Sequence, residues 1–103
     1  MNDPLARQRQ MVQQFPDHEL GRFSLGKALF DRGDYVEARE HLGRALAKKP
    51  DWMVVQILLG KCDLATGDRE GARKAFERAL ELAIAQHHEG PQAELEAQLA
   101  DLQ

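Results

Sequence analysis

Apolar and polar positions follow the period of an α-helix along most of the chain. Residues 20–30 carry apolar side chains at helical spacing and leave almost no polar face. The sequence "DRGD" at residues 31–34 interrupts this pattern, and an apolar stripe of small and large side chains follows: Ala38, Leu42, Ala45 and Leu46. Because glycine readily adopts the left-handed conformation that ends a helix, Gly33 predicts a tight turn between two helices. Asp34 is then expected to cap the second helix.

The whole pattern recurs further along the chain. "LGKALFDRGDYVEAREHLGRAL" begins at Leu25 and "LGKCDLATGDREGARKAFERAL" at Leu59, and the two segments are identical at ten of 22 positions. Gly26 and Gly60 fall inside the first helix of each unit, where glycine is about 1 kcal/mol less favourable than alanine. We therefore expect both glycines at helix contacts too close for a side chain, with Ala38 and Ala72 on the facing helices.

The segments outside the two units predict one more helix at each end. When the repeat is extended backward by one unit, residues 4–15 align with the second helix of a unit whose first helix is missing. Met11 then occupies the position equivalent to Ala45. Residues 91–102 begin with proline and place Leu95, Leu99 and Leu102 on one face, as in a capping helix. The helix before it is expected to continue toward His87 or His88.

The chain is therefore expected to form one domain over residues 1–103. Its parts are a half-repeat helix at 4–15, a first repeat at 19–52, a second repeat at 53–86 and a capping helix at 91–102. Half a repeat, two repeats and a cap supply about three hairpins, the number such stacks need for stability.

These residues resemble the tetratricopeptide repeat family, whose helix-turn-helix unit is about 34 residues long. The matching residues are Leu25-Gly26, Ala38, Ala45 and Pro50 in one unit and Leu59-Gly60, Ala72, Phe76 and Ala79 in the other. Arg22 and Gln56 replace an aromatic residue of the family pattern, and Ile84 replaces a proline. The resemblance implies an all-α, right-handed solenoid of helical hairpins.

The resemblance also implies a function and a site. In this family the first helices of successive repeats line a concave groove that holds a peptide, so we expect a non-catalytic protein–protein interaction module, or scaffold, that binds a short, largely apolar segment. The groove positions carried over by alignment are Leu20, Phe23, Lys27, Phe30, Asp31, Val54, Ile57, Lys61, Leu64 and Ala65. The two lysines are suited to pairing with an acidic side chain or terminal carboxylate of the partner. The alternative for any one of these residues is a place in the core between helices.

Composition and charge narrow the class of partner. The net charge of −3 argues against nucleic-acid binding, and the longest apolar stretch, residues 52–59, is too short to span a membrane. Residues 1–50 carry nine Lys/Arg and seven Asp/Glu, whereas residues 51–103 carry five and ten. This asymmetry either is chance or favours weak head-to-tail association. The alternative function is therefore a self-associating structural protein whose groove is filled by a terminal helix of another copy.

Candidate catalytic and metal-binding residues are few. Cys62 is the only cysteine, which excludes an internal disulfide and, with no signal peptide at the start, favours the cytoplasm. Lys61 beside it would lower the pKa of the thiol, but Cys62 replaces Ala28 of the first unit, which favours a packed residue. The four histidines show no zinc-binding spacing. We predict no enzyme, cofactor or metal; the rival reading is an enzyme that uses Cys62 or the histidines.

Overall fold

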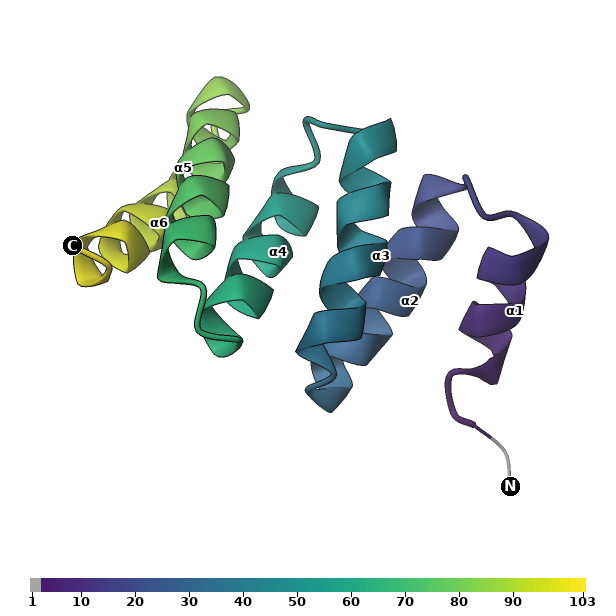
Figure 1. Cartoon of the computed structure of the whole chain (residues 1–103). Coiled ribbons are helices and arrows are strands. Elements are labelled where there is room, and N and C mark those ends of the chain that lie inside the picture. Colours follow the sequence, from purple (N-terminus) through teal and green to yellow (C-terminus); the bar gives the residue numbers. More distant parts are fainter. Residues whose placement is uncertain (1–2) are drawn as a thin grey trace.

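A computed structural model describes residues 3–103, which form six α-helices and no strand. The helices are α1 (Ala6–Gln14), α2 (Glu19–Arg32), α3 (Tyr35–Lys48), α4 (Met53–Ala65), α5 (Arg69–Ala85) and α6 (Glu89–Asp101). Consecutive helices pack side by side, and α1 and α6 lie at opposite ends of a 43 × 27 × 20 Å body (Figure 1). The predicted all-α solenoid is confirmed.

Two helical hairpins, α2–α3 and α4–α5, form the middle of the molecule, and each turns at a glycine. Gly33 and Gly67 have φ angles of 86° and 89°, a left-handed conformation that strains any residue with a Cβ. After the second turn, Asp68 Oδ1 accepts a 2.8 Å hydrogen bond from the amide of Gly71 and so caps α5. The expected cap at Asp34 is wrong: its carboxylate makes no capping bond and pairs instead with Arg32, at 3.3 Å.

Each hairpin has a close contact between its two helices at a glycine of the first helix. A Cβ placed on Gly26 would lie 2.8 Å from Cγ of Leu42, and one placed on Gly60 would lie 2.6 Å from Cε1 of Phe76. The glycines therefore admit a large side chain of the second helix. The expected partners, Ala38 and its counterpart, are fully buried but are not the residues that press on the glycines.

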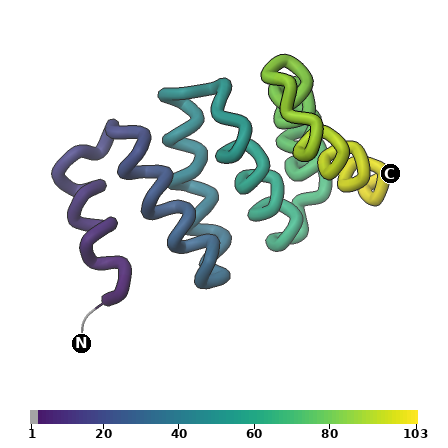
Figure 2. Tube along the Cα trace, turned by 180° about the vertical axis from the view of Figure 1, so that it is seen from behind, coloured from purple at the N-terminus to yellow at the C-terminus, as the bar shows by residue number. Residues whose placement is uncertain are grey.

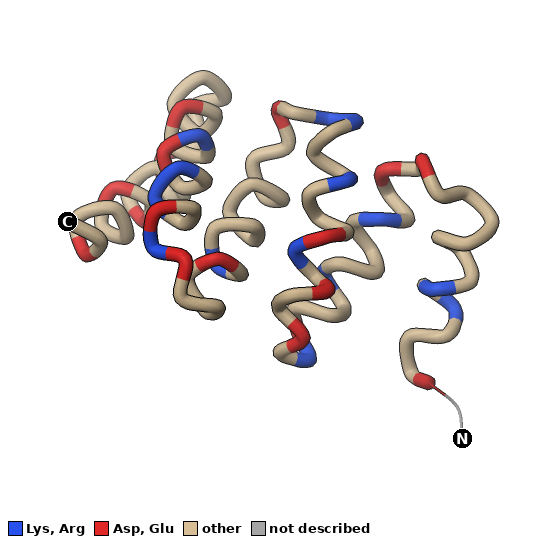
Figure 3. The backbone as a smooth tube through the Cα atoms, viewed as in Figure 1, with Lys and Arg blue, Asp and Glu red and all other residues tan. Residues whose placement is uncertain are grey.

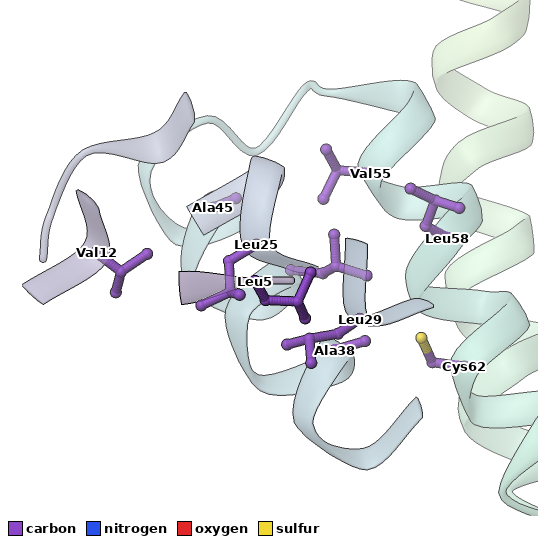
Figure 4. Packing of buried hydrophobic residues seen from close by; sticks show 10 residues of the cluster. Leu5, Val12, Leu25, Leu29, Ala38, Ala45, Val55, Leu58 and Cys62 are labelled. Carbon is purple, nitrogen blue, oxygen red and sulfur yellow. The ribbon is translucent and has the colours of Figure 1, made fainter. Parts of the chain in front are cut away.

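Two apolar clusters stabilise the stack. The first joins α1, α2, α3 and one side of α4, and it includes Leu5, Val12, Leu25, Leu29, Ala38, Leu42, Ala45, Val55, Leu58 and Cys62 (Figure 4). The second joins the other side of α4 to α5 and α6 through Met53, Ala72, Phe76, Ala79, Leu82, Ala83 and Leu95. Because α4 contributes to both clusters, its sequence is apolar on nearly all sides.

The two end helices cover the stack from either side. Leu5 before α1 and Val12 within it are buried, as is Leu95 of α6. The helix expected to run on to His87 or His88 ends instead at Ala85, because His87 adopts a φ of 59° and the amide of His88 bonds back to the carbonyl of Ala83 at 2.9 Å. None of the described helices has the length and apolar character needed to cross a membrane.

Candidate functional site

The ten predicted groove residues occupy equivalent places in the two repeats. Five lie on α2, and each has its equivalent on α4 one repeat later: Leu20 and Val54, Phe23 and Ile57, Lys27 and Lys61, Phe30 and Leu64, Asp31 and Ala65. We call the surface that carries them the α2–α4 face; both helices lie on the near side in Figure 2. Leu20 is 58% exposed and Val54 is 46% exposed.

Four apolar members of the α2–α4 face are shared between surface and core. Phe23 and Phe30 are half-buried against the first cluster, and Ile57 and Leu64 against the second. The ring of Phe23 lies 4.8 Å from that of Trp52, at the start of α4, and this contact joins the two hairpins. Each of these side chains is therefore partly in the core and only partly exposed on the α2–α4 face.

The two lysines of the α2–α4 face differ in their surroundings. Lys27 Nζ donates to both carboxylate oxygens of Asp31, at 2.8 and 2.9 Å, one turn further along α2. The residue equivalent to Asp31 in α4 is Ala65, and within residues 3–103 no carboxylate lies within ion-pair distance of the exposed Lys61. Of these two lysines, Lys61 on α4 is therefore the one that carries a positive charge with no ion-pair partner among the described residues.

A hollow of about 500 Å³ lies between α1 and α2, at the N-terminal end of the stack. We call it the N-terminal hollow; its lining residues are Arg7, Gln8, Met11, Phe15, His18, Leu20, Gly21 and Ser24. Met11 and Phe15 are 47% and 54% exposed, so its wall is apolar and open. Leu20 is the predicted site residue found here. Apolar residues within 4–15 were the sequence signal that could have indicated the other lining residues. The hollow itself forms only because α1 packs against α2.

A chain of polar contacts fixes α1 against the first hairpin. Arg22 donates from Nε to the carbonyl of Pro16 at 2.8 Å and from Nη1 to Nδ1 of His41 at 2.9 Å. His41 Nε2 lies 3.6 Å from Oε2 of Glu37, which also binds Arg9 of α1. Burial, together with the charge of Arg22, lowers the pKa of His41. The histidine is therefore a neutral member of a structural network.

The cysteine considered for catalysis lies in the core. Cys62 is fully buried in the first cluster, and burial raises the pKa of its thiol to about 11, so it is not a thiolate at neutral pH. The neighbouring Asp63 is also buried and pairs with Arg39 of α3. Among residues 3–103 no three His, Cys, Asp or Glu side chains are grouped as metal ligands.

Comparison with known proteins gives consistent matches along the chain. The family model described as "Tetratricopeptide repeat" matches residues 29–99. The chain is 45% identical over 80 residues to the TPR repeat-containing protein PA0015 of Pseudomonas aeruginosa, a span that covers 78% of this chain and 74% of that protein.

Solved structures resemble the chain over nearly its full length. The solution structure of protein BPP2914 from Bordetella parapertussis superimposes with a TM-score of 0.81 at 34% identity, covering 99% of this chain and 89% of that one. The crystal structure of PcrH in complex with the chaperone binding region of PopD gives a TM-score of 0.84 at 23% identity, covering 92% and 72%. The second likeness concerns the fold alone.

Proposed function

Because the chain belongs to the tetratricopeptide repeat family, we propose that it is a protein–protein interaction module that binds a short, largely apolar segment of a partner on the α2–α4 face. Proteins of this family are generally non-enzymatic interaction modules, and we assign no catalysis to this chain. Its lone cysteine is buried and reduced, which suits the cytoplasm as the proposed compartment.

The repeated exposure of an apolar residue at one helix position carries the proposal. Leu20 and Val54 occupy the same place in their repeats, and both leave about half of a large apolar side chain in water. A half-buried apolar residue follows each of them one turn later, Phe23 in α2 and Ile57 in α4. A linear row of apolar positions on a rigid surface is suited to an extended or helical segment with apolar side chains.

The charge on the α2–α4 face adds a preference for the ligand. Lys61 is exposed and Lys27 is already paired with Asp31, so a carboxylate of the ligand gains most when it reaches α4. The face rests on two packed clusters and on the Phe23–Trp52 contact, so little of it has to become ordered on binding. We therefore expect the preferred segments to be apolar with an acidic residue toward one end.

The solved structure of PcrH supports the general part of the proposal, that a protein of this fold can bind a polypeptide. That protein was crystallised in complex with the chaperone binding region of PopD, a segment of another protein. At 23% identity this likeness supports the idea that such a stack can hold a polypeptide segment, and it names no partner for this chain.

The proposal is tested by selecting ligands and mapping where they bind. The wild-type chain is used to select from a library of short random peptides, and the enriched peptides are titrated into isotopically labelled protein. We expect amide shifts concentrated in α2 and α4, and weaker binding by Val54→Glu/Lys61→Glu. Both substituted side chains are exposed, so the variant should remain folded.

Val36→Glu is the matched control, because Val36 is 77% exposed and lies on α3, away from the α2–α4 face. It should bind the selected peptides as the wild type does. Peptides whose shifts map to α3 and α5, or whose affinity is the same for all three proteins, would show that the assigned face is wrong.

A further inference from the structure

Within residues 3–103 no helix precedes α1, whereas its counterparts α3 and α5 each pair with the helix before them. Gln8 and Met11 of α1 precede Leu42 and Ala45 of α3 by one repeat, and those two residues are completely buried against α2 in their own hairpin. Met11, by contrast, is 47% exposed and lines the N-terminal hollow. The hollow is thus the place where the first helix of an additional hairpin would lie.

The last helix has the complementary gap. Leu95 and Leu99 of α6 pack against the second cluster as Leu58 and Cys62 of α4 pack against the first, and the members of both pairs are equally far apart in the sequence. At the same spacing Ala97 corresponds to Gly60, the residue that receives Phe76 of the following helix. Ala97 is exposed, so the face of α6 that would meet a second helix is open and lined by a small side chain.

The N-terminal hollow also holds an unsatisfied polar atom. Oε1 of Gln8 is buried and has no hydrogen-bond partner among the described residues. Around it are the apolar side chains of Met11, Phe15 and Leu20, and Arg7 is the only charged side chain in the lining. An occupant that combines a hydrogen-bond donor, small residues and negative charge would satisfy this surface.

Charge distinguishes the two end helices in the same sense. Arg7 and Arg9 are the charged residues of α1, whereas α6 carries Glu89, Glu94, Glu96 and Asp101 and no basic residue (Figure 3). Arg9 is already paired with Glu37 and Asp3, which leaves Arg7 facing the hollow. The acidic end of one molecule therefore complements the basic end of another.

We propose that α6 of one copy packs on α1 of the next, in the N-terminal hollow, so that the solenoid continues head to tail from molecule to molecule. The two helices together build a hairpin between molecules that resembles those within the stack. Each contact joins two different surfaces, so the interface is heterologous and leaves one free end on each side. This inference goes beyond the proposed function: Met11 and Ala97 lie outside the α2–α4 face, and Leu20 is the residue that the face shares with the hollow.

Two variants, each with one blocked end, test the proposal. Met11→Glu places a negative charge in the hollow, and Ala97→Arg places a long positive side chain on the open face of α6; both positions are exposed, and circular dichroism would verify the fold. In sedimentation at about 500 μM, where weak interfaces are populated, the wild type should show a weight-average mass above its monomer mass of 11.6 kDa. Each variant alone should stay monomeric.

An equimolar mixture of the two variants decides the geometry. Met11→Glu keeps a functional α6 and Ala97→Arg keeps a functional hollow, so the mixture should form heterodimers and nothing larger. Val36→Glu and Val54→Glu/Lys61→Glu should assemble like the wild type, which separates this interface from the peptide-binding face. A monomeric wild type at this concentration, a mixture that stays monomeric, or peptides that fill the hollow of a non-assembling protein would each overturn the proposal.

Discussion

The two complete hairpins use the same steric contact but bury their polar groups in different places. Gly26 meets Leu42 in the first, and Gly60 meets Phe76 in the second. Leu29 in the first hairpin corresponds to the buried Asp63 in the second. The buried pair Arg22 and His41, in turn, corresponds to Gln56 and Ala75.

The location of these polar groups follows a rule. Asp63 of α4 reaches back to Arg39 of α3, in the preceding hairpin, and the Arg22–His41 network reaches through Glu37 to Arg9 of α1. Both sets thus extend to a junction with the preceding unit, although the bond between Arg22 and His41 itself lies inside the first hairpin. The apolar contact inside a hairpin is common to both units, and the polar pairs distinguish one junction from the next.

The largest effect is expected at the junction between the two hairpins. Arg39→Ala leaves the carboxylate of Asp63, 3% exposed, without its partner, and should lower the free energy of unfolding by about 3 kcal/mol. The matched control is Arg73→Ala, the equivalent arginine of the second hairpin, whose surface pairs with Glu70 and Glu77 should be worth at most about 1 kcal/mol. Urea unfolding measures both.

A double variant checks the cause. Asp63→Leu introduces the residue found at the equivalent position of the first hairpin, Leu29. It also removes the buried charge that Arg39→Ala leaves without a partner. Arg39→Ala/Asp63→Leu should therefore be more stable than Arg39→Ala alone. Equal instability of the two would mean that Arg39 acts through packing of its stem and not through the ion pair.

An intermediate effect is expected at the glycines inside helices. Gly60→Ala brings a Cβ to 2.6 Å from the ring of Phe76, an overpacked contact that should lower the free energy of unfolding by about 1–3 kcal/mol. Gly43→Ala, in α3, meets nothing within 4 Å and should instead raise it by about 0.5–1 kcal/mol through helix propensity. Thermal unfolding followed by circular dichroism distinguishes the signs.

Relief of the clash gives the corresponding check. Phe76→Leu copies Leu42 of the first hairpin and shortens the side chain that the new methyl group meets. In the Gly60→Ala background it should recover part of the lost stability. If Phe76→Leu instead lowers the stability of Gly60→Ala by as much as it lowers that of the wild type, the two residues do not interact as their distance indicates.

The smallest effect concerns pH. The folded-state pKa of His41 lies below its ordinary value of 6.5. Burial and the charge of Arg22 lower this pKa, and together they outweigh the carboxylates of Glu37 and Glu40, which raise it. As the pH falls below 6.5 the unfolded chain takes up a proton at His41 before the folded chain does, so this contribution to stability is present above that pH and is lost below it. Urea midpoints at about pH 7.5 and pH 5.5 measure the difference.

His41→Ala, which copies Ala75 of the second hairpin, isolates this contribution. The variant is expected to be less stable at both pH values, because Arg22 loses an acceptor, but its stability should vary less between them than that of the wild type. An unchanged pH dependence would assign the titration to another group.

Several elements followed from local residues and could be predicted. Gly33 and the glycine-containing "ATGD" turn ended helices because glycine adopts the left-handed conformation found there without strain. Gly26 and Gly60 marked close helix contacts because a glycine inside a helix needs a compensating reason. The two wrong predictions also have local causes. The carboxylate of Asp34 pairs with Arg32 and does not cap α3, and α5 ends before His87 because His87 adopts a positive φ.

The sequence by itself determined the repeat, the helical hairpins and the family, because these depend on a regular period that is visible in residue types. The ten residues proposed for binding came from the resemblance to the family, and they stay a prediction. Only the tertiary structure decided which of these residues are half-buried and that Lys27 forms an ion pair with Asp31. It also showed that α1 and α2 enclose a hollow. Exposure and pairing depend on which helices lie next to one another, and the period of a sequence does not contain that information.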